Sequence, residues 1–406
     1  MRLPIRSTFF SMTLAGVALS AAFGFFRQSP VDAAGPVEPA RSSFRVLTPV
    51  ESGNLLLFPV VQTGKLPPAP FLTLDEGIKS GEVEITEAGR VRGLVRPRPP
   101  AGPQDGVRPR PIPPPYRGDQ VNTLVLVNNS DKPLLLLAGE IVTGGKQDRI
   151  IAKDRIVPAG SNPIDLGVFC IEPGRWTEDT ATFRASAGTS TQSIMVQPMV
   201  REKAMVAKDQ QEVWNSVHGA IGGALQAPVP PSSGLAMNSP NPESLGTTSY
   251  ARAMQNSAVS AKVDEAAAPL TKSREQILQK LREEHAVGVV VAVRGQIVWA
   301  DIFSDTDLLA RYWTKLVRSY AAESLLEGDT HAAPSVADAQ NFLAIPPEGT
   351  ETSIGDVGVY RYRELRSAGS ETFVLESLLP GTGYDVHISK LKMRGELRRS
   401  KAPMLY

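Results

Sequence analysis

The sequence predicts an α+β protein, built from a β-rich, sandwich-like N-terminal unit, a helical segment and a smaller α/β C-terminal unit. Three observations support this class. Between residues 121 and 172, short apolar runs alternate with turn residues, and no helical pattern separates them, which favours antiparallel pairing. Apolar residues then recur at helical spacing. From residue 287 a hairpin, an amphipathic helix and further strands follow. The predicted ranges are 42–197, 198–286 and 287–395.

The N-terminus has the layout of a secretory signal. Residues 1–26 carry two arginines followed by an apolar run, and the small residues Val31 and Ala33 fit a cleavage after Ala33. The alternative is an uncleaved membrane anchor, because the run approaches the length that spans a bilayer. Under either interpretation the protein leaves the cytosol, and we expect it to be secreted or periplasmic, with segment 1–33 as the signal peptide.

The β-rich unit contains one conspicuous interruption. Thr73 or Asp75 fits the start of a single helical turn within 71–89. Residues 95–120 then contain the pentapeptide VRPRP twice, and because proline lacks a backbone donor this segment cannot join a sheet. The prediction is a solvated polyproline loop, with recognition by a proline-binding protein partner as the alternative.

Helices are expected in the middle and near the end of the chain. Val206, Val213, Trp214, Val217 and Ile221 lie at helical spacing in a run that ends at Gly222 and Gly223. A segment rich in Pro, Ser and Asn at 226–247 predicts a flexible linker, and helical character resumes over 250–285, where Ser273 and Gln276 have capping-box spacing.

The C-terminal unit begins with a predicted hairpin centred on Arg294 and Gly295. The helix that follows has Ser304 or Asp305 as its cap, Gly328 as its stop, and one continuous apolar stripe that indicates a core face. The stripe consists of Leu309, Tyr312, Trp313, Leu316, Val317, Tyr320 and Leu325. Strands at 357–365, 371–378 and 384–392 complete the unit.

Composition excludes several classes of function. A net charge of +1 gives no basic surface for a nucleic acid, so we expect no nucleic-acid partner. The single cysteine, Cys170, permits no internal disulfide, and a buried thiol is the simplest expectation for it. A membrane contact is expected only if the N-terminal segment stays uncleaved.

The stretch LLLLAGEIVTGGKQDR at 134–149 places charge directly after four leucines. If Gly144 and Gly145 form a two-residue turn, Glu140 faces Arg149 across the hairpin. A buried carboxylate needs such a partner, so a structural ion pair is one interpretation. In the other, the pair borders a pocket in which Glu140 is a base and Lys146 or Arg149 binds an anion.

A second polar cluster, CIEPGRW at 170–176, combines Cys170, Glu172, Arg175 and Trp176. Cysteine catalysis requires a base, and the four histidines are distant in sequence. The spacing of Gly144, Gly145 and Lys146 does not match a phosphate-binding loop, and no metal-binding, nucleophile-elbow or dinucleotide pattern is present. We therefore expect no metal and no cofactor.

These two clusters, with VPAGS at 157–161, carry a family resemblance. These three segments, and their order along the chain, resemble the domain family named for its association with ADP-ribosylglycohydrolase and rhodanese-phosphatase proteins. The domain of that family has no known function. LFPVV at 57–61, WTKLVRSYAAESL at 313–325 and VHISKLKM at 386–393 extend the resemblance over about residues 42–395. It implies a connection with ADP-ribose or nucleotide metabolism through gene association and assigns no catalytic residue.

Two hypotheses follow for the function, and the sequence does not decide whether the protein is an enzyme. The first is a polar pocket for a small anionic ligand, with Glu140, Glu172 and Cys170 as candidate catalytic residues. Its candidate ligand-binding residues are Lys146, Gln147, Arg149, Arg175 and Trp176. The second is a non-catalytic envelope interaction or scaffold protein, in which the charged pairs are internal struts and the proline-rich loop contacts a partner.

Overall fold

A computed structural model describes the chain with several gaps. The described residues are 44–62, 70–88, 122–174, 180, 182–185, 194–226, 247–271, 279, 281–344 and 349–393. They lie in one compact unit that begins at Ser43. The predicted signal peptide 1–33, the proline-rich loop 95–120, nearly all of 226–247 and the capping box at Ser273 and Gln276 lie outside the described residues.

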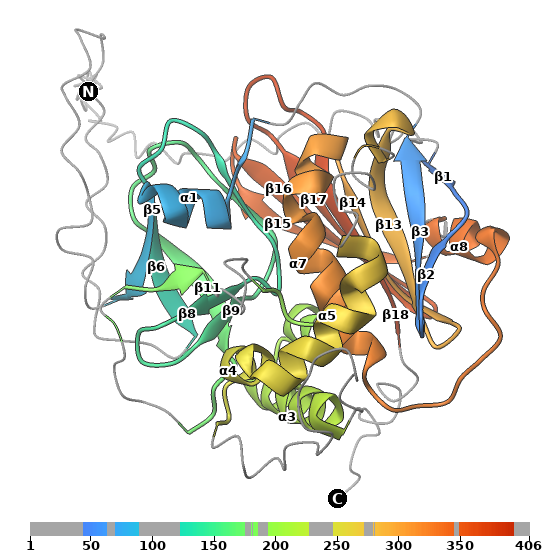
Figure 1. The fold of residues 1–406 in the computed structure, drawn as a ribbon. Helices are drawn as coiled ribbons and strands as arrows, with labels where there is room; N and C mark the ends of the chain where they lie inside the picture. The colour runs from blue at the N-terminus through green and yellow to red at the C-terminus, as the bar shows by residue number, and fades with distance from the viewer. Residues whose placement is uncertain are drawn as a thin grey trace, which may run out of the picture. The chain divides into compact units, whose positions relative to one another are not determined.

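The largest sheet joins the first described strands to the last ones. It is antiparallel throughout, has nine strands, and runs in the order β1, β3, β13, β14, β18, β17, β16, β15, with β2 pairing beside β1 on β3 (Figure 1). The strands are β1 (Phe44–Val46), β2 (Val50–Ser52), β3 (Leu55–Gln62), β13 (Ala286–Val293), β14 (Gln296–Phe303), β15 (Thr350–Asp356), β16 (Tyr360–Ser367), β17 (Ser370–Ser377) and β18 (Asp385–Lys392).

Two smaller sheets form the β-rich part. A six-stranded antiparallel sheet runs β12, β8, β9, β11, β6, β5, and a three-stranded one runs β10, β7, β4, whose β4–β7 pair is parallel. The strands are β4 (Leu72–Thr73), β5 (Val83–Glu87), β6 (Thr123–Asn128), β7 (Leu134–Leu136), β8 (Ile141–Thr143), β9 (Arg149–Ile151), β10 (Arg155–Val157), β11 (Ile164–Cys170) and β12 (Arg184–Ala185).

The described helices are α1 (Leu74–Ser80), α2 (Pro198–Glu202), a π-helical turn (Lys203–Ala207), α3 (Gln210–Gln226), α4 (Tyr250–Gln255), α5 (Ser257–Thr271), α7 (Thr306–Ser324) and α8 (Val336–Leu343). Predicted caps are confirmed at two of them. Thr73 caps α1 in a capping box with Glu76, and Asp305 caps α7. Among the described helices, none combines the length and the apolar character needed to cross a membrane.

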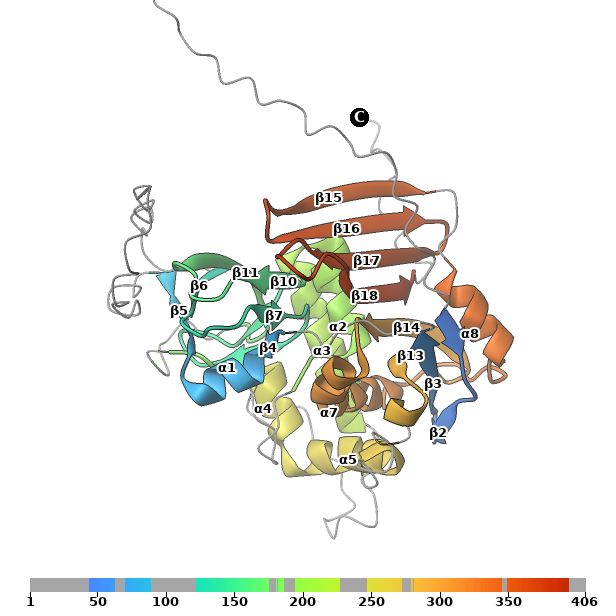
Figure 2. The ribbon, with the colours of Figure 1, turned by 90° about the horizontal axis from the view of Figure 1, so that it is seen from above.

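The α+β class is confirmed, and the nine-stranded sheet explains where the core lies. Strands β3 and β13 are apolar at nearly every position because both of their faces are covered. Leu57 and Val291 belong to the main core with α7, whereas Phe58 and Val290 face the cluster that contains residues of α8. Figure 2 shows α7 and α8 on opposite sides of these strands.

Two details differ from the sequence prediction. The strands within 44–62 pair with C-terminal strand β13 rather than with the β-rich part, so the sheet of the C-terminal region is the larger one. Helix α3 also continues through Gly222 and Gly223. A Cβ atom at Gly223 would lie 2.6 Å from the Leu326 side chain, so this glycine permits close packing and does not end the helix.

Candidate functional site

Glu140 lies in the closed interior, where a lysine from α7 neutralises it. Its side chain is 1% exposed, and one oxygen accepts the Leu137 N–H at 2.7 Å. The other oxygen lies 2.6 Å from Nζ of Lys315, which also reaches Asp75 at 2.6 Å. Burial raises the pKa of Glu140, and Lys315 opposes that shift. The carboxylate is thus one side of a buried ion pair.

The predicted pairing of Glu140 with Arg149 is wrong, although the hairpin exists. Strands β8 and β9 pair Ile141 with Ile150 and Val142 with Arg149, which is a register shift of two residues. The cause is a longer loop. The carboxylate of Asp148 accepts the Gly144 N–H at 3.2 Å, so residues 144–148 form the bend in place of a two-residue turn. Arg149 is fully buried at the start of β9.

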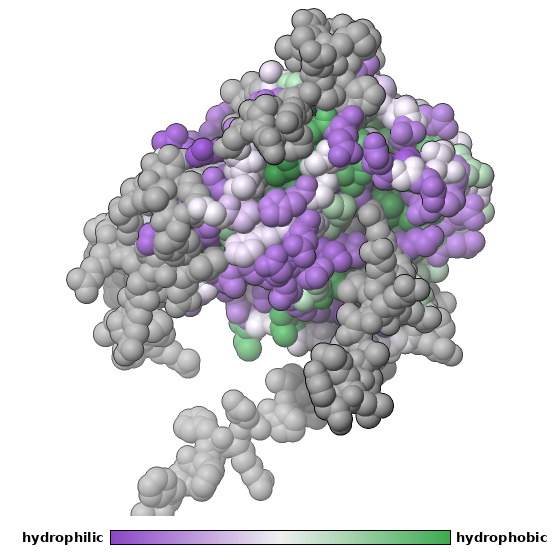
Figure 3. Space-filling model, turned by 90° about the horizontal axis from the view of Figure 1, so that it is seen from below, coloured by the Kyte–Doolittle hydropathy of each residue, from purple (hydrophilic) through white to green (hydrophobic). Residues whose placement is uncertain are grey.

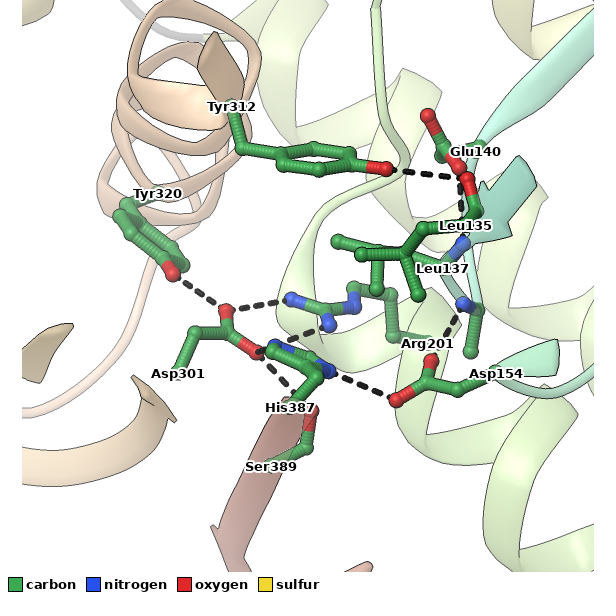
Figure 4. A network of polar contacts seen from close by, with 11 residues as sticks. Leu135, Leu137, Glu140, Asp154, Arg201, Asp301, Tyr312, Tyr320, His387 and Ser389 are labelled. Atoms are coloured by element: carbon green, nitrogen blue, oxygen red, sulfur yellow. Dashed lines mark hydrogen bonds and ion pairs between the residues drawn. The ribbon is translucent and has the colours of Figure 1, made fainter. Parts of the chain in front are cut away.

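A larger charged cluster, centred on Asp301, lies deeper in the core (Figure 4). The guanidinium group of Arg201 binds both oxygens of Asp301, at 2.8 and 3.0 Å, and neither side chain is exposed. Tyr320 donates a hydrogen bond to the same carboxylate, and Ser389 donates one at 2.9 Å. The Arg201 guanidinium carbon also lies 4.4 Å from the centroid of the Trp299 ring.

His387 extends this cluster to the β-rich part of the chain. Its Nδ1 lies 2.6 Å from Asp154, and its Nε2 lies 3.3 Å from Asp301. The other oxygen of Asp154 accepts the Ala138 N–H at 2.7 Å, two residues before Glu140. Through buried polar contacts the cluster therefore links the loops that follow β7 and precede β10 to α2, α7, β14 and β18.

The ionisation states follow from this geometry. Burial alone would raise the pKa of Asp301, but Arg201 and His387 hold it well below its ordinary value. Burial likewise opposes protonation of His387, yet its two carboxylate neighbours raise its pKa to about 9. At neutral pH we therefore expect Arg201 and His387 to be cationic and Asp301 to be anionic, with Asp154 as a second acidic neighbour of His387. The arrangement stabilises the core and offers no opening to a substrate.

The double-glycine loop and the CIEPG corner do meet. Gln147 donates its amide to the Glu172 carbonyl at 3.1 Å, and the Asp148 N–H donates to the Glu172 carboxylate at 3.1 Å. Cys170 pairs with Arg149 across β11 and β9. Of the predicted site residues, the structure thus brings together Gln147, Arg149, Cys170 and Glu172, and it places Glu140 in the separate pair with Lys315.

The remaining candidates have different surroundings. The Cys170 side chain is buried, and desolvation raises its thiol pKa, which opposes nucleophilic chemistry. Lys146 is half-buried in the loop, and its N–H donates to Glu87 at 2.9 Å. Arg175 and Trp176 lie outside the described residues.

A polar cavity of about 170 Å³ lies beside this loop. It is open to solvent, in contrast to the charged core. Two arginines, Arg184 on β12 and Arg252 on α4, contribute to its wall, and Nε of Arg252 lies 4.0 Å from Glu172. Other lining residues are Thr143, Gly144, Asp148, Thr180 and Gln255. Two arginines and two threonines among the lining residues suit an anionic oxygen ligand, and the carboxylate of Asp148 suits a ligand hydroxyl.

Sequence reasoning missed most of the buried charges. A charged residue within an apolar run is the pattern that pointed to Glu140. The same pattern occurs at Asp301, His387 and Lys315. Arg184 and Arg252 lie in ordinary polar sequence, so only the fold reveals that they share a cavity. No group of acidic, histidine or cysteine side chains suited to a metal ion occurs among the described residues.

Fold and site together define an α+β protein with a sealed ionic core and a shallow polar cavity. The chain belongs to the family of the ARG and Rhodanese-Phosphatase-superfamily-associated Protein domain, whose model matches residues 43–391. The resemblance expected from the sequence is thereby confirmed. Searches of curated proteins and of solved structures gave no match.

Proposed function

We propose that this chain is an exported protein that binds a small anionic ligand in the cavity beside Gly144 and Gly145. The observation that carries the proposal is that two arginines, Arg184 and Arg252, line one open polar cavity. Arginine is the preferred side chain for binding phosphate and carboxylate groups in two-point geometry. The buried candidates Glu140 and Cys170 have no part in this site.

The ligand class follows from the other groups in the wall. Asp148 already accepts hydrogen bonds from the Gly144 N–H and from the Ser249 hydroxyl, at 3.2 and 2.6 Å. A simple anion would be repelled by this carboxylate, whereas a phosphorylated sugar can present its phosphate to the arginines and a hydroxyl to Asp148. ADP-ribose, nucleotides and sugar phosphates are the compounds of this class, and the family's association points in the same direction.

The test is a calorimetric titration of purified protein with ADP-ribose, AMP and ribose 5-phosphate. We expect Arg184→Gln to weaken binding of a responsive compound by at least about tenfold, since a charged hydrogen bond contributes roughly 1.5–3 kcal/mol. Arg361→Gln is the matched control, because Arg361 is a half-exposed arginine on β16, far along the chain from the cavity. If none of the three titrations gives heat of binding, the proposal is overturned.

A second function is favoured by one observation, the closed ionic core. Glu140 is buried beside Lys315, and Asp301 is buried beside Arg201 and His387, so these ion pairs fit structural contacts inside a non-catalytic envelope or scaffold protein. The face drawn in Figure 3 is largely hydrophilic with small apolar areas between, which gives a mixed surface for protein contacts. The proline-rich segment 95–120 is the proposed contact with a proline-binding partner. A variant that lacks residues 95–120 separates the two functions: it should lose the protein partner and keep binding of the small ligand.

A further inference from the structure

The two edge strands of the nine-stranded sheet, β1 and β15, differ in what covers their outer backbone groups in the described part of the chain. At one end, the Gln340 side chain of α8 forms hydrogen bonds with the backbone of β1. Its oxygen accepts the Val46 N–H at 2.9 Å, and its amide donates to the Phe44 carbonyl at 2.9 Å. Gln340 thus takes the place of a neighbouring strand. Such covering prevents an edge strand from pairing with another chain.

The opposite end is strand β15, which has β16 as its strand partner in the described part of the chain. Figure 2 shows β15 at the outer border of the sheet. Residues Thr350 to Gly355 are all exposed, and the strand pairs with β16 over seven residues in continuous register, without a bulge. Its sequence, TETSIGD, lacks the lysine, proline and bulge that commonly protect an edge.

Apolar exposure is concentrated at the same edge. Three large apolar side chains are exposed among the described residues: Val50, Ile354 and Val357. Ile354 is 48% exposed on β15, and Val357 is fully exposed in the turn that follows it. Ile354 is also the cross-strand neighbour of buried Tyr362, so it lies where an apolar stripe of the sheet reaches the border. A further strand beside β15 would cover it.

We propose that β15 pairs antiparallel with β15 of a second copy of this chain, about a two-fold axis at Ser353. In this register Thr350 faces Asp356, Glu351 faces Gly355 and Thr352 faces Ile354, so neither acid faces another acid. Val357 lies opposite Gly349, where it has space. The β-branched pair of Thr352 with Ile354 is favourable, and the two Ile354 side chains share one face of the joined sheet.

The strand is self-complementary, which is the reason to assign a second copy as its occupant. A two-fold axis pairs residue i of one copy with residue j of the other and j with i, and TETSIGD gives no clash of charge at any of these pairs. The contact is smaller than a standard interface of about 1,600 Å². We therefore expect a reversible dimer that dissociates on dilution.

A cysteine on the axis tests the register. In the full-length protein, Ser353→Cys places two thiols on opposed residues, whose Cα atoms lie about 4.5–5.5 Å apart, within disulfide range. Glu351→Cys is the matched control, because its two copies are offset by four residues, about 14 Å along the strands. The native thiol of Cys170 is buried and does not interfere. Under mild oxidation we expect a disulfide-linked dimer for Ser353→Cys and little or none for Glu351→Cys.

Sedimentation equilibrium provides a second measurement that needs no thiol. We expect the apparent mass of the wild type to rise with concentration, and Ile354→Lys to abolish the rise. Val50→Lys, an exposed apolar residue on β2, should leave it unchanged. A wild type that stays monomeric at the highest concentration, or equal cross-linking of the two cysteine variants, would overturn the proposal. Unchanged association in Ile354→Lys would do the same.

Discussion

Arg201 and Asp301 lie 100 residues apart in the chain, and their side chains form a two-point ion pair without solvent exposure. Burying both charges is costly, and the pair recovers that cost only while both partners and their hydrogen bonds remain. Tyr320 and Ser389 donate hydrogen bonds to the same carboxylate, and Nε2 of His387 lies 3.3 Å from it. We therefore expect the fold to be sensitive to the loss of either member of this pair.

Removing one partner should be much worse than removing both. We expect Arg201→Met to lower the free energy of unfolding by about 3–5 kcal/mol, because it leaves Asp301 buried and uncompensated. The double variant Arg201→Met/Asp301→Leu should recover a substantial part of the loss. Urea unfolding followed by circular dichroism measures both. Arg282→Met, which breaks an exposed pair with Asp307, should cost less than about 1 kcal/mol.

Stability should decrease as the solution becomes alkaline. The folded pKa of His387, about 9, is above its ordinary value of 6.5, so its contribution is fully present below pH 6.5 and is lost as pH rises towards 9. The loss amounts to about 3 kcal/mol. Lys390, whose pKa is lowered to about 8 chiefly by burial, acts in the opposite sense above that pH.

The contribution of His387 is isolated by comparison with a variant. Unfolding free energies of the wild type and of His387→Gln at pH 6, 7.5 and 9 should differ most at pH 6 and converge at pH 9. A gap that stays constant across this range would contradict a protonated His387.

The Gly145 backbone should be intolerant of any side chain. Its φ of 51° is left-handed, and a Cβ atom there would lie 2.2 Å from the Phe183 ring. Gly53 has nearly the same φ, 56°, with no atom within 4 Å of a Cβ. We expect Gly53→Ala to cost about 1–2 kcal/mol for the conformation alone, and Gly145→Ala to cost clearly more. Thermal denaturation of the two variants gives the comparison, and equal losses would rule out the steric contribution.

Glu140 should behave as a structural residue and have no role in ligand binding. Glu140→Gln removes the charge opposite Lys315 and should lower the unfolding free energy by about 3 kcal/mol. Glu212→Gln, in a more exposed and longer pair with Lys203, is the matched control, with less than about 1 kcal/mol expected. Titration of folded Glu140→Gln with a ligand of the cavity should give wild-type affinity. A large loss of affinity would return Glu140 to the candidate site.

The export proposal also has a direct measurement. Expression in a host with a secretory pathway should yield a chain whose first residue is Ala34, as found by intact mass and N-terminal sequencing. Ala33→Asp should block this cleavage, because signal peptidase requires a small side chain there. Full-length protein in the membrane fraction would instead support the uncleaved anchor.

Local patterns in the sequence predicted much of the fold. The spacing from Leu309 to Leu325, the cap at Asp305 and the hairpin at Arg294 and Gly295 depend on neighbouring residues and are confirmed. The pairing of β3 with β13 joins segments more than 200 residues apart, and no local signal specifies it. The end of α3 was predicted less well, because the sequence alone does not distinguish a glycine that permits close packing from one that ends a helix.

For the candidate site, the sequence indicated where charge is buried and gave no reliable partners. Glu140 after four leucines was a sound signal, yet its partner is Lys315 on a distant helix. The Gly144 N–H donates to the Asp148 carboxylate within the bend, and the hairpin register differs by two residues from the prediction. Gln147 and Glu172 are both candidates for the predicted pocket and do lie in contact, whereas Arg184 and Arg252 come to line one cavity only through the fold.

The pairing of Val60 with Gly288 has a consequence for biogenesis. The ribosome must add more than 200 residues after β3 before its partner strand β13 is made, so β3 cannot take its place in the large sheet until late in synthesis. If the chain is exported, as proposed, this late pairing keeps the polypeptide unfolded enough to pass through a translocation channel. The sheet would then assemble after export without an internal disulfide, because the sequence contains a single cysteine.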